Sequence, residues 1–203
     1  MASGTLKLKQ QRSRERREQI LAAATRLFGE KGIDRTSLTD IAGAAKVPLS
    51  SIYDYFADKR ALILEVPEGN FEALYQKTEP LLVKGDDAVA QLRIIFMTNF
   101  EYISENPSWG RVFFLEIWPS VLASEPRVKK AVDKYALRYV NLIKRAIRAG
   151  TYRRSLDPYT AMSLMMGGMC HLTAVWLLYD RKYDLVKKGK ALFSTLHNGF
   201  VRR

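Results

Sequence analysis

The side chains best suited to contact another molecule lie between residues 49 and 59, where hydroxyl-bearing and aromatic residues are closely spaced. They are Leu49, Ser50, Ser51, Tyr53, Tyr55 and Lys59. Short hydroxyls and small apolar groups suit base edges and thymine methyls, and a lysine ammonium group suits a phosphate. We therefore predict that the first three read bases while Tyr53 and Lys59 hold phosphates. A structural helical hairpin with a solvated polar face is the alternative interpretation.

Positive charge gathers near the start of the chain. Between Lys7 and Arg17 there are six basic residues and a single acid, Glu15. Such an arm adds DNA affinity by releasing counterions from phosphates, and we expect it to be disordered in the absence of DNA. The candidate DNA contacts in this arm are Arg12, Arg14 and Arg17.

The whole chain of 203 residues carries 33 Lys and Arg against 21 Asp and Glu, a formal net charge of +12. This excess favours an anionic partner: nucleic acid, an acidic membrane surface or a phosphorylated small molecule. One cysteine and two histidines argue against a disulfide and against a metal site of nitrogen and sulfur ligands. We therefore predict no metal and no cofactor. We also predict a reducing cytoplasmic location, because the basic arm is not followed by the apolar stretch that a secretory signal needs.

Helices must position the candidate DNA contacts, because apolar residues recur at spacings of three and four along almost the whole chain. A first helix is predicted over residues 13–31, ending before Gly32. Ser37 or Thr36 can cap a short second helix, and Pro48 suits the first turn of a third helix through Tyr55. Two short helices four residues apart, with small alanines where they cross, form a helix-turn-helix pattern.

Six further helices follow, so the predicted fold is all-α with nine helices. The fourth begins after Asp58, and Pro67 and Gly69 are expected to kink or break it, since proline removes a backbone donor. The other five are predicted over residues 86–105, 109–118, 126–149, 158–180 and 184–201. Composition changes near residue 65, which divides the chain into domains of residues 1–65 and 66–203.

Catalysis and membrane insertion are poorly supported. Cys170 and His171 are adjacent, so on a helix they point about 100° apart and cannot act together as nucleophile and base. Glu116 lies among aromatic residues and could be a carboxylate with a shifted pKa. A glutamate on the solvent-exposed face of a helix is the commoner explanation, so we assign it no reaction. Residues 158–179 contain no charged side chain; their polar residues and glycine pair favour a buried subunit interface over a bilayer span.

The segment ILAAATRLFGEKGIDRTSLTDIAGAAKVPLSSIYDYFADKRALI, residues 20–63, resembles the DNA-binding domain of the TetR family of transcriptional regulators. The elements that carry the resemblance are Leu27-Phe28 with Gly32, Thr36-Ser37, Ile41-Ala42, Ile52-Tyr53, Tyr55-Phe56 and Lys59. The resemblance implies a homodimer in which three N-terminal helices bind DNA and six further helices bind ligand and dimerise. It adds Thr36 and Ser37 to the expected DNA contacts.

Two positions depart from the family pattern. Lys46 stands where the family usually has the turn glycine, so a left-handed turn there would cost about 1 kcal/mol. A different type of turn is the alternative. Pro67 and Gly69 are unusual in the fourth helix, which is the lever between the two domains in this family.

Residues 156–200 resemble the last two helices of the fatty-acid-degradation branch of the family, whose ligands are long-chain acyl-CoAs. Trp176 and Tyr183-Asp184-Leu185 carry most of this likeness. The expected ligand-binding residues are Phe96, Phe100, Phe114, Trp118, Tyr135, Tyr139, Met166 and Met169, although filling of the core is the commoner role of such methionines. The expected dimer interface comprises Leu164, Gly168, His171, Val175, Leu178, Leu192, Phe193, Leu196 and Phe200.

Basic residues also form a stripe along the predicted seventh helix: Arg127, Lys130, Lys134, Arg138, Arg145 and Arg148. The stripe is either a solvated face or a binding strip for the phosphates of a nucleotide-bearing ligand. The predicted function is a repressor that binds operator DNA as a homodimer and is released by a small hydrophobic effector, with a long-chain acyl-CoA as the candidate. Two alternatives are an effector-independent DNA-binding protein and a helical enzyme acting on an acyl or phosphorylated substrate.

Overall fold

The computed structural model describes residues 2–83, 87–180 and 182–201, with side chains from Leu8 onward. Nine α-helices are present in these residues, together with short 3₁₀ turns and one π-helical turn. The α-helices are α1 (Ala2–Lys31), α2 (Leu38–Ala44), α3 (Leu49–Tyr53), α4 (Lys59–Thr78), α5 (Ala88–Glu105), α6 (Pro107–Arg111), α7 (Pro126–Arg148), α8 (Pro158–Leu178) and α9 (Leu185–Phe200). The short turns are η1 (Glu79–Leu81), η2 (Val112–Ile117, π-helical) and η3 (Val121–Ser124). The predicted all-α fold is confirmed.

Side-chain caps explain where several helices begin. The side chains of Asp58, Asp157 and Asp184 accept hydrogen bonds from backbone N–H groups three residues later, at 2.7, 2.7 and 2.9 Å. These bonds satisfy donors that the first turn of a helix leaves free. The predicted starts of α4, α8 and α9 are therefore confirmed to within a residue or two.

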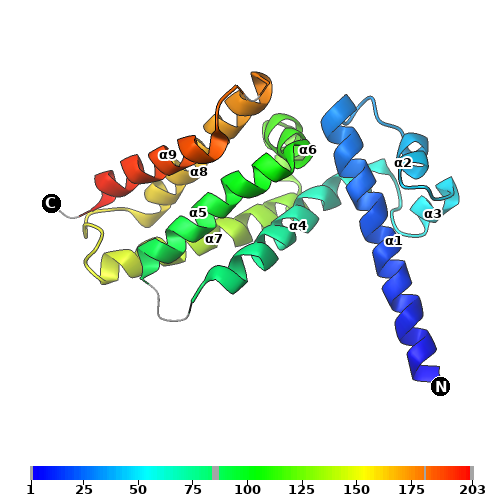
Figure 1. Ribbon diagram of the computed structural model, residues 1–203, viewed down its shortest axis with the longest axis horizontal. Helices are drawn as coiled ribbons and strands as arrows, with labels where there is room; N and C mark the ends of the chain where they lie inside the picture. Colours follow the sequence, from blue (N-terminus) through cyan, green and yellow to red (C-terminus); the bar gives the residue numbers. More distant parts are fainter. Residues whose placement is uncertain (1, 84–86, 181, 202–203) are drawn as a thin grey trace.

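The helices form two units (Figure 1). Helices α1, α2 and α3 lie together at one end, and α4 leads from them into a bundle in which α5 packs against α7 and α9, and α8 against α9. The packing of α9 on α5 requires Gly189, because a Cβ atom at that position would overlap the ring of Phe100. The N-terminal end of α1 projects well beyond the rest of the molecule.

The N-terminal arm differs from the prediction. The first helix begins at Ala2 instead of near residue 13, so the segment expected to be disordered without DNA forms part of α1. The physical reason is local, because residues 2–13 contain no proline and are rich in lysine, leucine and glutamine, which readily extend an existing helix. The side chain of Lys7 lies outside the described residues.

The fourth helix is also not broken. Pro67 is buried inside α4, which runs without interruption from Lys59 to Thr78. Val66 and Phe71 on either side of the proline are buried as well, so burial of apolar surface holds the helix together across the missing hydrogen bond. The predicted sixth helix, by contrast, divides into the short α6 and the π-helical turn η2.

Candidate nucleic-acid interface and interdomain contacts

The turn between α2 and α3 keeps a left-handed residue despite the absence of glycine. Lys46 has a φ of 52° and is exposed. Its N–H group donates to the carbonyl of Gly43 at 3.1 Å, and that of Val47 donates to Ala42 at 3.0 Å. Lysine therefore adopts the backbone conformation that glycine favours, with the strain that a Cβ atom brings.

The N-terminal part of α3 presents only some of the predicted base-reading side chains. Leu49 and Ser50 are exposed, and Tyr53 is 56% exposed. Ser51 is buried at the contact with the rest of the unit. We therefore assign the expected base contacts to Leu49 and Ser50 and give Ser51 a packing role.

Four other predicted DNA contacts surround α3. Tyr55 is half-buried and its hydroxyl accepts a hydrogen bond from Ser13 on α1 at 3.3 Å. Lys59 is half-buried and donates to the backbone carbonyl of Asp34 at 3.4 Å. Thr36 and Ser37, which precede α2, differ from one another in their accessibility.

Thr36 is 1% exposed, and its hydroxyl donates to the carbonyl of Gly32 at 2.8 Å. Thr36 thus holds the loop before α2 and does not reach the surface. Ser37 is exposed and shares a capping box with Asp40: the Asp40 N–H donates to the serine hydroxyl at 3.0 Å, and the Ser37 N–H donates to the carboxylate at 2.9 Å. The Ser37 hydroxyl also donates to the Asp40 carboxylate, at 2.6 Å, and this bond together with the one from the Ser37 N–H group lowers the pKa of Asp40 below its usual value.

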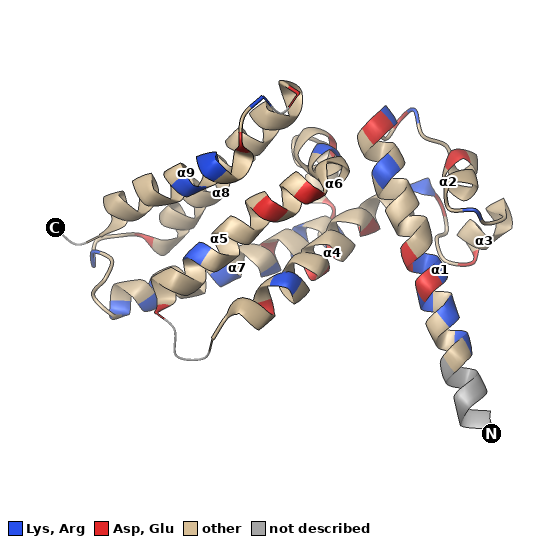
Figure 2. Ribbon diagram, viewed as in Figure 1, with Lys and Arg blue, Asp and Glu red and all other residues tan. Residues whose placement is uncertain are grey.

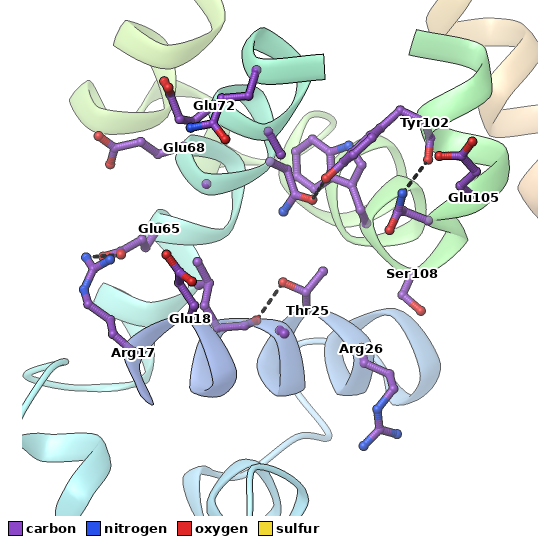
Figure 3. A pocket seen from close by; sticks show the side chains of 18 of the residues that line it. Arg17, Glu18, Thr25, Arg26, Glu65, Glu68, Glu72, Tyr102, Glu105 and Ser108 are labelled. Atoms are coloured by element: carbon purple, nitrogen blue, oxygen red, sulfur yellow. Dashed lines mark hydrogen bonds and ion pairs between the residues drawn. The ribbon is translucent and has the colours of Figure 1, made fainter. Parts of the chain in front are cut away.

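The basic residues of α1 divide into free and engaged groups. Lys and Arg follow one another along the projecting part of the helix (Figure 2). Arg12 is exposed. Arg14 pairs with Glu18 one turn away, at 2.9 Å, and both members of this pair are at the surface. Arg17 is different, because it forms an ion pair with Glu65 on α4 (Figure 3) and lies 5.4 Å from the ring centre of Phe56.

Glu65 joins three helices. Its side chain is 7% exposed, and one carboxylate oxygen pairs with Arg17 of α1 while the other accepts a hydrogen bond from Arg127 of α7 at 3.1 Å. Arg127 also binds Glu68, at 2.6 Å. A buried carboxylate needs such partners, because an unpaired charge in the interior is strongly unfavourable.

A cleft of about 880 Å³ opens beside this ion-pair network, between α1, α4, α5 and α6 (Figure 3). Its wall includes Glu18, Glu65, Glu68, Glu72 and Glu105, together with Arg14, Arg17, Arg26 and Arg127. All five carboxylates pair with a lysine or arginine, so the wall offers no unpaired acidic group among the residues that the structure describes. None of the eight predicted ligand-binding residues lines this cleft.

Most of the predicted ligand-binding residues fill the interior of the C-terminal bundle. The rings of Phe96 and Phe100 are 5.2 Å apart, and the hydroxyls of Tyr135 and Tyr139 accept hydrogen bonds from the Asn99 amide at 2.7 and 2.9 Å. Burial raises the pKa of Tyr135 to about 12.

The remaining members of that set are less uniform. Phe114 and Met169 are buried, Met166 is half-buried, and Trp118 is 43% exposed. The aromatic groups are thus brought together, with Trp118 and Met166 nearer the surface.

The basic stripe of α7 is largely an interhelical contact. Arg127, Lys134 and Arg138 pair with glutamates of α4 and η1, and Arg138 also donates to Thr78 at 3.0 Å. Arg145 donates to the amide oxygen of Gln91 on α5 at 2.9 Å. Four members of the stripe, Arg127, Lys134, Arg138 and Arg145, therefore bind α7 to its neighbours, whereas Lys130 and Arg148 are exposed, as a solvated face requires.

The predicted dimer face is mostly uncovered in the subunit. Leu164 is 51% and Leu178 63% exposed, His171 is also exposed, and Val175 is half-buried. By length and composition α8 could cross a membrane, with mean hydropathy 1.5 in its most apolar window, and only 33% of that window is buried. An exposed apolar face of this kind marks a surface suited to contact another molecule.

The α9 part of the predicted face contributes less. Leu192 and Leu196 are half-buried, whereas Phe193 packs on Phe96 with ring centres 5.6 Å apart and is 6% exposed. Phe200 is likewise buried, against Tyr152. Gly168 packs beneath Leu192 of its own chain, where a Cβ atom would come within 2.9 Å of a leucine methyl group. Phe193, Phe200 and Gly168 therefore pack within their own subunit.

Sequence reasoning missed the role of Glu116. Its carboxylate accepts a hydrogen bond from the backbone N–H of Ile33 at 2.7 Å, across 83 residues of sequence. The aromatic residues around Glu116 marked the position as unusual, but no local pattern indicated this partner.

Comparison with known proteins agrees with this geometry. Residues 20–66 match the model described as bacterial regulatory proteins of the tetR family, and residues 69–199 match the C-terminal region of YsiA-like protein. The fatty acid metabolism regulator protein of Bacillus subtilis is 22% identical over 181 residues, covering 89% of this chain and 93% of the relative. The repressor KstR2 of Mycobacterium tuberculosis is 27% identical over 145 residues, covering 70% and 72% of the two chains.

Solved structures share the fold. FadR from Bacillus subtilis in complex with stearoyl-CoA superimposes with a TM-score of 0.84 at 22% identity, covering 90% of this chain and 98% of that chain. The fatty acid degradation regulator FadR from Bacillus halodurans gives a TM-score of 0.83 at 23% identity, with the same coverage.

Proposed function

The chain belongs to the TetR family of bacterial transcriptional regulators, and from this premise we propose a repressor that binds operator DNA as a homodimer and is released by a long-chain acyl-CoA. The relatives are named as regulators and repressors, not as enzymes. The expected location is the cytoplasm, where operator DNA lies.

One observation carries the DNA-binding part of the proposal. The residues matched to the DNA-binding domain fold into a helix-turn-helix whose α3 exposes Leu49, Ser50 and Tyr53, beside a projecting basic helix. A recognition helix enters the major groove with its N-terminal residues at the base edges, while basic residues outside it bind phosphates. Two copies of this unit, related by a twofold axis, would read a palindromic site.

The exposed apolar face of α8 supports the homodimer. In such an assembly α8 and half-buried residues of α9 from two subunits pack as a four-helix seam, which removes Leu164 and Leu178 from water. A C2 seam uses the same patch on both subunits, so a single exposed helix face is sufficient to build it.

The likeness to acyl-CoA regulators supports the choice of effector. One structural neighbour holds stearoyl-CoA, and the interior of this chain's bundle is lined with aromatic and methionine side chains that suit an acyl chain. The polar cleft beside Glu65 suits an acyl chain poorly. We therefore propose that the acyl chain binds among Phe96, Phe100, Phe114 and the other predicted ligand-binding residues, which must separate to admit it.

A ligand releases DNA only if it binds the DNA-incompetent arrangement more tightly, and typical coupling is about 1 to 3 kcal/mol. Operator fragments selected from genomic DNA with the purified protein would be used in mobility-shift titrations with stearoyl-CoA, stearate and coenzyme A. We expect stearoyl-CoA to weaken binding at least fivefold and coenzyme A to have no effect.

Each outcome of that titration has a separate meaning. Release by a ketosteroid-derived compound instead of stearoyl-CoA would retain the repressor and replace the effector class, as the likeness to KstR2 allows. Failure to select any DNA fragment would overturn the repressor itself.

A further inference from the structure

The loop between α1 and α2 is held from outside its own domain. The chain leaves α1 through Gly32, whose φ of 91° is one that side chains rarely adopt, and the next N–H group, that of Ile33, points to the carboxylate of Glu116. The second carboxylate oxygen lies 3.6 Å from the position that a Cβ atom of Gly32 would occupy. The carboxylate therefore covers the Gly32–Ile33 peptide.

This loop is mechanically connected to the recognition unit. Thr36 donates to the carbonyls of Gly32 and Leu27 at 2.8 and 3.3 Å, so the loop and the end of α1 form one hydrogen-bonded piece. Ser37 follows at once and caps α2. A displacement of the Ile33 amide would therefore reach the start of α2, which packs on α3.

Glu116 itself is half-buried, and its neighbours in sequence belong to the aromatic interior of the C-terminal bundle. It lies in the π-helical turn η2 with Phe113 and Phe114, which are buried and have ring centres 5.1 Å apart. Phe113 also stacks near Trp109 of α6 and Trp118. A π-turn holds one more residue than an α-turn, so a change in its register rotates the side chains it carries by about 100°.

A second contact ties the same platform to α1. Gly29 packs directly on the backbone of Ser108 at the start of α6, where a Cβ atom would come within 2.6 Å of the Ser108 Cα and carbonyl oxygen. Helix α6 and turn η2 together therefore bear on the C-terminal end of α1. The DNA-binding unit rests on this platform as well as on α4.

We propose that Glu116 is a positioning residue for operator binding: through its hydrogen bond to Ile33 the C-terminal bundle sets the placement of the helix-turn-helix. Entry of an effector among the aromatic residues of η2 withdraws the carboxylate, and the loop before α2 shifts. The effector part of this inference rests on the proposed function, whereas the positioning part needs only operator binding.

The test compares variants that change the carboxylate in graded ways. Glu116→Gln keeps an oxygen that can accept from Ile33, and Glu116→Asp keeps the charge but shortens the reach by one methylene. Glu105→Gln and Glu105→Asp are the matched controls, because Glu105 is an exposed glutamate whose partner is Lys77. Operator affinity, thermal midpoint and dimer content would be measured for each.

We expect Glu116→Asp to bind operator at least tenfold more weakly than wild type, with an unchanged thermal midpoint, whereas Glu116→Gln and both controls stay within threefold. Equal operator affinity for Glu116→Asp and wild type would overturn the proposal. So would a loss of affinity that merely follows a lowered thermal midpoint, because that pattern indicates a structural role alone.

Amide hydrogen exchange tests the coupling directly and without any variant. In wild-type protein saturated with stearoyl-CoA, peptides covering residues 32–37 are expected to exchange at least fivefold faster than in the free protein. Unchanged protection with bound stearoyl-CoA would reject Glu116 as the coupling residue. If stearoyl-CoA does not bind at all, the acyl-CoA assignment fails, and the comparison of the Asp and Gln variants still decides the positioning role.

Discussion

Arg17 on α1 and Arg127 on α7 share the carboxylate of Glu65 on α4, so one buried side chain links the DNA-binding unit to α4 and α7. Arg17 was expected to bind a DNA phosphate. Its guanidinium group instead lies between α1 and α4, beside Phe56.

This shared carboxylate predicts a measurable coupling between the domains. A double-mutant cycle of Arg17→Ala and Glu65→Ala should give an interaction energy of about 1 kcal/mol in urea unfolding, since Glu65 is buried and Arg17 is half-exposed. The exposed pair Arg14 and Glu18 is the control and should give about 0.3 kcal/mol. Equal values for the two pairs would show that burial of Glu65 adds nothing.

DNA contacts should separate into two classes. Lys59→Ala should weaken binding to all sequences about equally and reduce the salt slope by about 1, because a phosphate contact releases a counterion. Ser50→Ala should change the preference among operators, and Ser51→Ala, whose hydroxyl is buried, should not. Binding isotherms at several salt concentrations measure the first effect and competition between operator variants the second. An unchanged salt slope for Lys59→Ala would reject its phosphate role.

The exposed face of α8 predicts where dimerisation is lost. Leu164→Glu and Leu178→Glu should each yield monomers that no longer bind operator. The reason is that burying an unpaired charge at the seam would weaken dimerisation by roughly several kcal/mol. Leu81→Glu is the matched control, since Leu81 is 50% exposed but lies on η1. Light scattering distinguishes the species. Gly168→Glu is unsuitable, because Leu192 of the same chain fills the space its side chain would need.

The pairing of Arg138 predicts a stability effect in place of a ligand effect. Its guanidinium group donates to Glu79 at 2.6 Å and lies 4.3 Å from the ring centre of Tyr75. Arg138→Glu should therefore lower the free energy of unfolding by about 2 kcal/mol, whereas Arg148→Glu, at an exposed position, should change it by less than about 0.5 kcal/mol. A selective loss of acyl-CoA affinity at unchanged stability would instead restore the phosphate-binding interpretation.

Cys170 provides a pH-dependent test of the α8 packing. Burial raises the pKa of its thiol from 9.0 to about 11, so at pH 8 only about one part in a thousand is the reactive thiolate. Alkylation by iodoacetamide at pH 8 should be slow in the native protein and at least tenfold faster in urea, with Cys170→Ser as the unlabelled control. As pH rises from about 9 to 11, the thiol of the unfolded chain ionises while that of the native protein stays protonated. The free energy of unfolding should therefore fall over this range. Equal native and unfolded alkylation rates would contradict the raised pKa.

Local chemistry explains which predictions succeeded. The caps Asp58, Asp157 and Asp184 act on backbone groups three residues away, so the starts of α4, α8 and α9 follow from neighbouring residues alone. A break at Pro67, one of the two outcomes expected there, does not occur, because the effect that prevents it is not local. Burial of the surrounding residues depends on elements distant in sequence, and it outweighs the local defect.

By itself the sequence determined the helical class and the helix-turn-helix between residues 37 and 59, because periodic apolar spacing and short capping motifs are encoded within one or two turns. The family followed from the resemblance of residues 20–63 to the TetR DNA-binding domain. The tertiary structure alone decided which partner a polar group takes on another helix or loop. Arg138 binds Glu79 across 59 residues, and Glu116 binds the Ile33 amide across 83. The chemistry of a side chain determines whether it needs a donor or an acceptor. Only the packing of the helices brings one particular group within hydrogen-bonding distance.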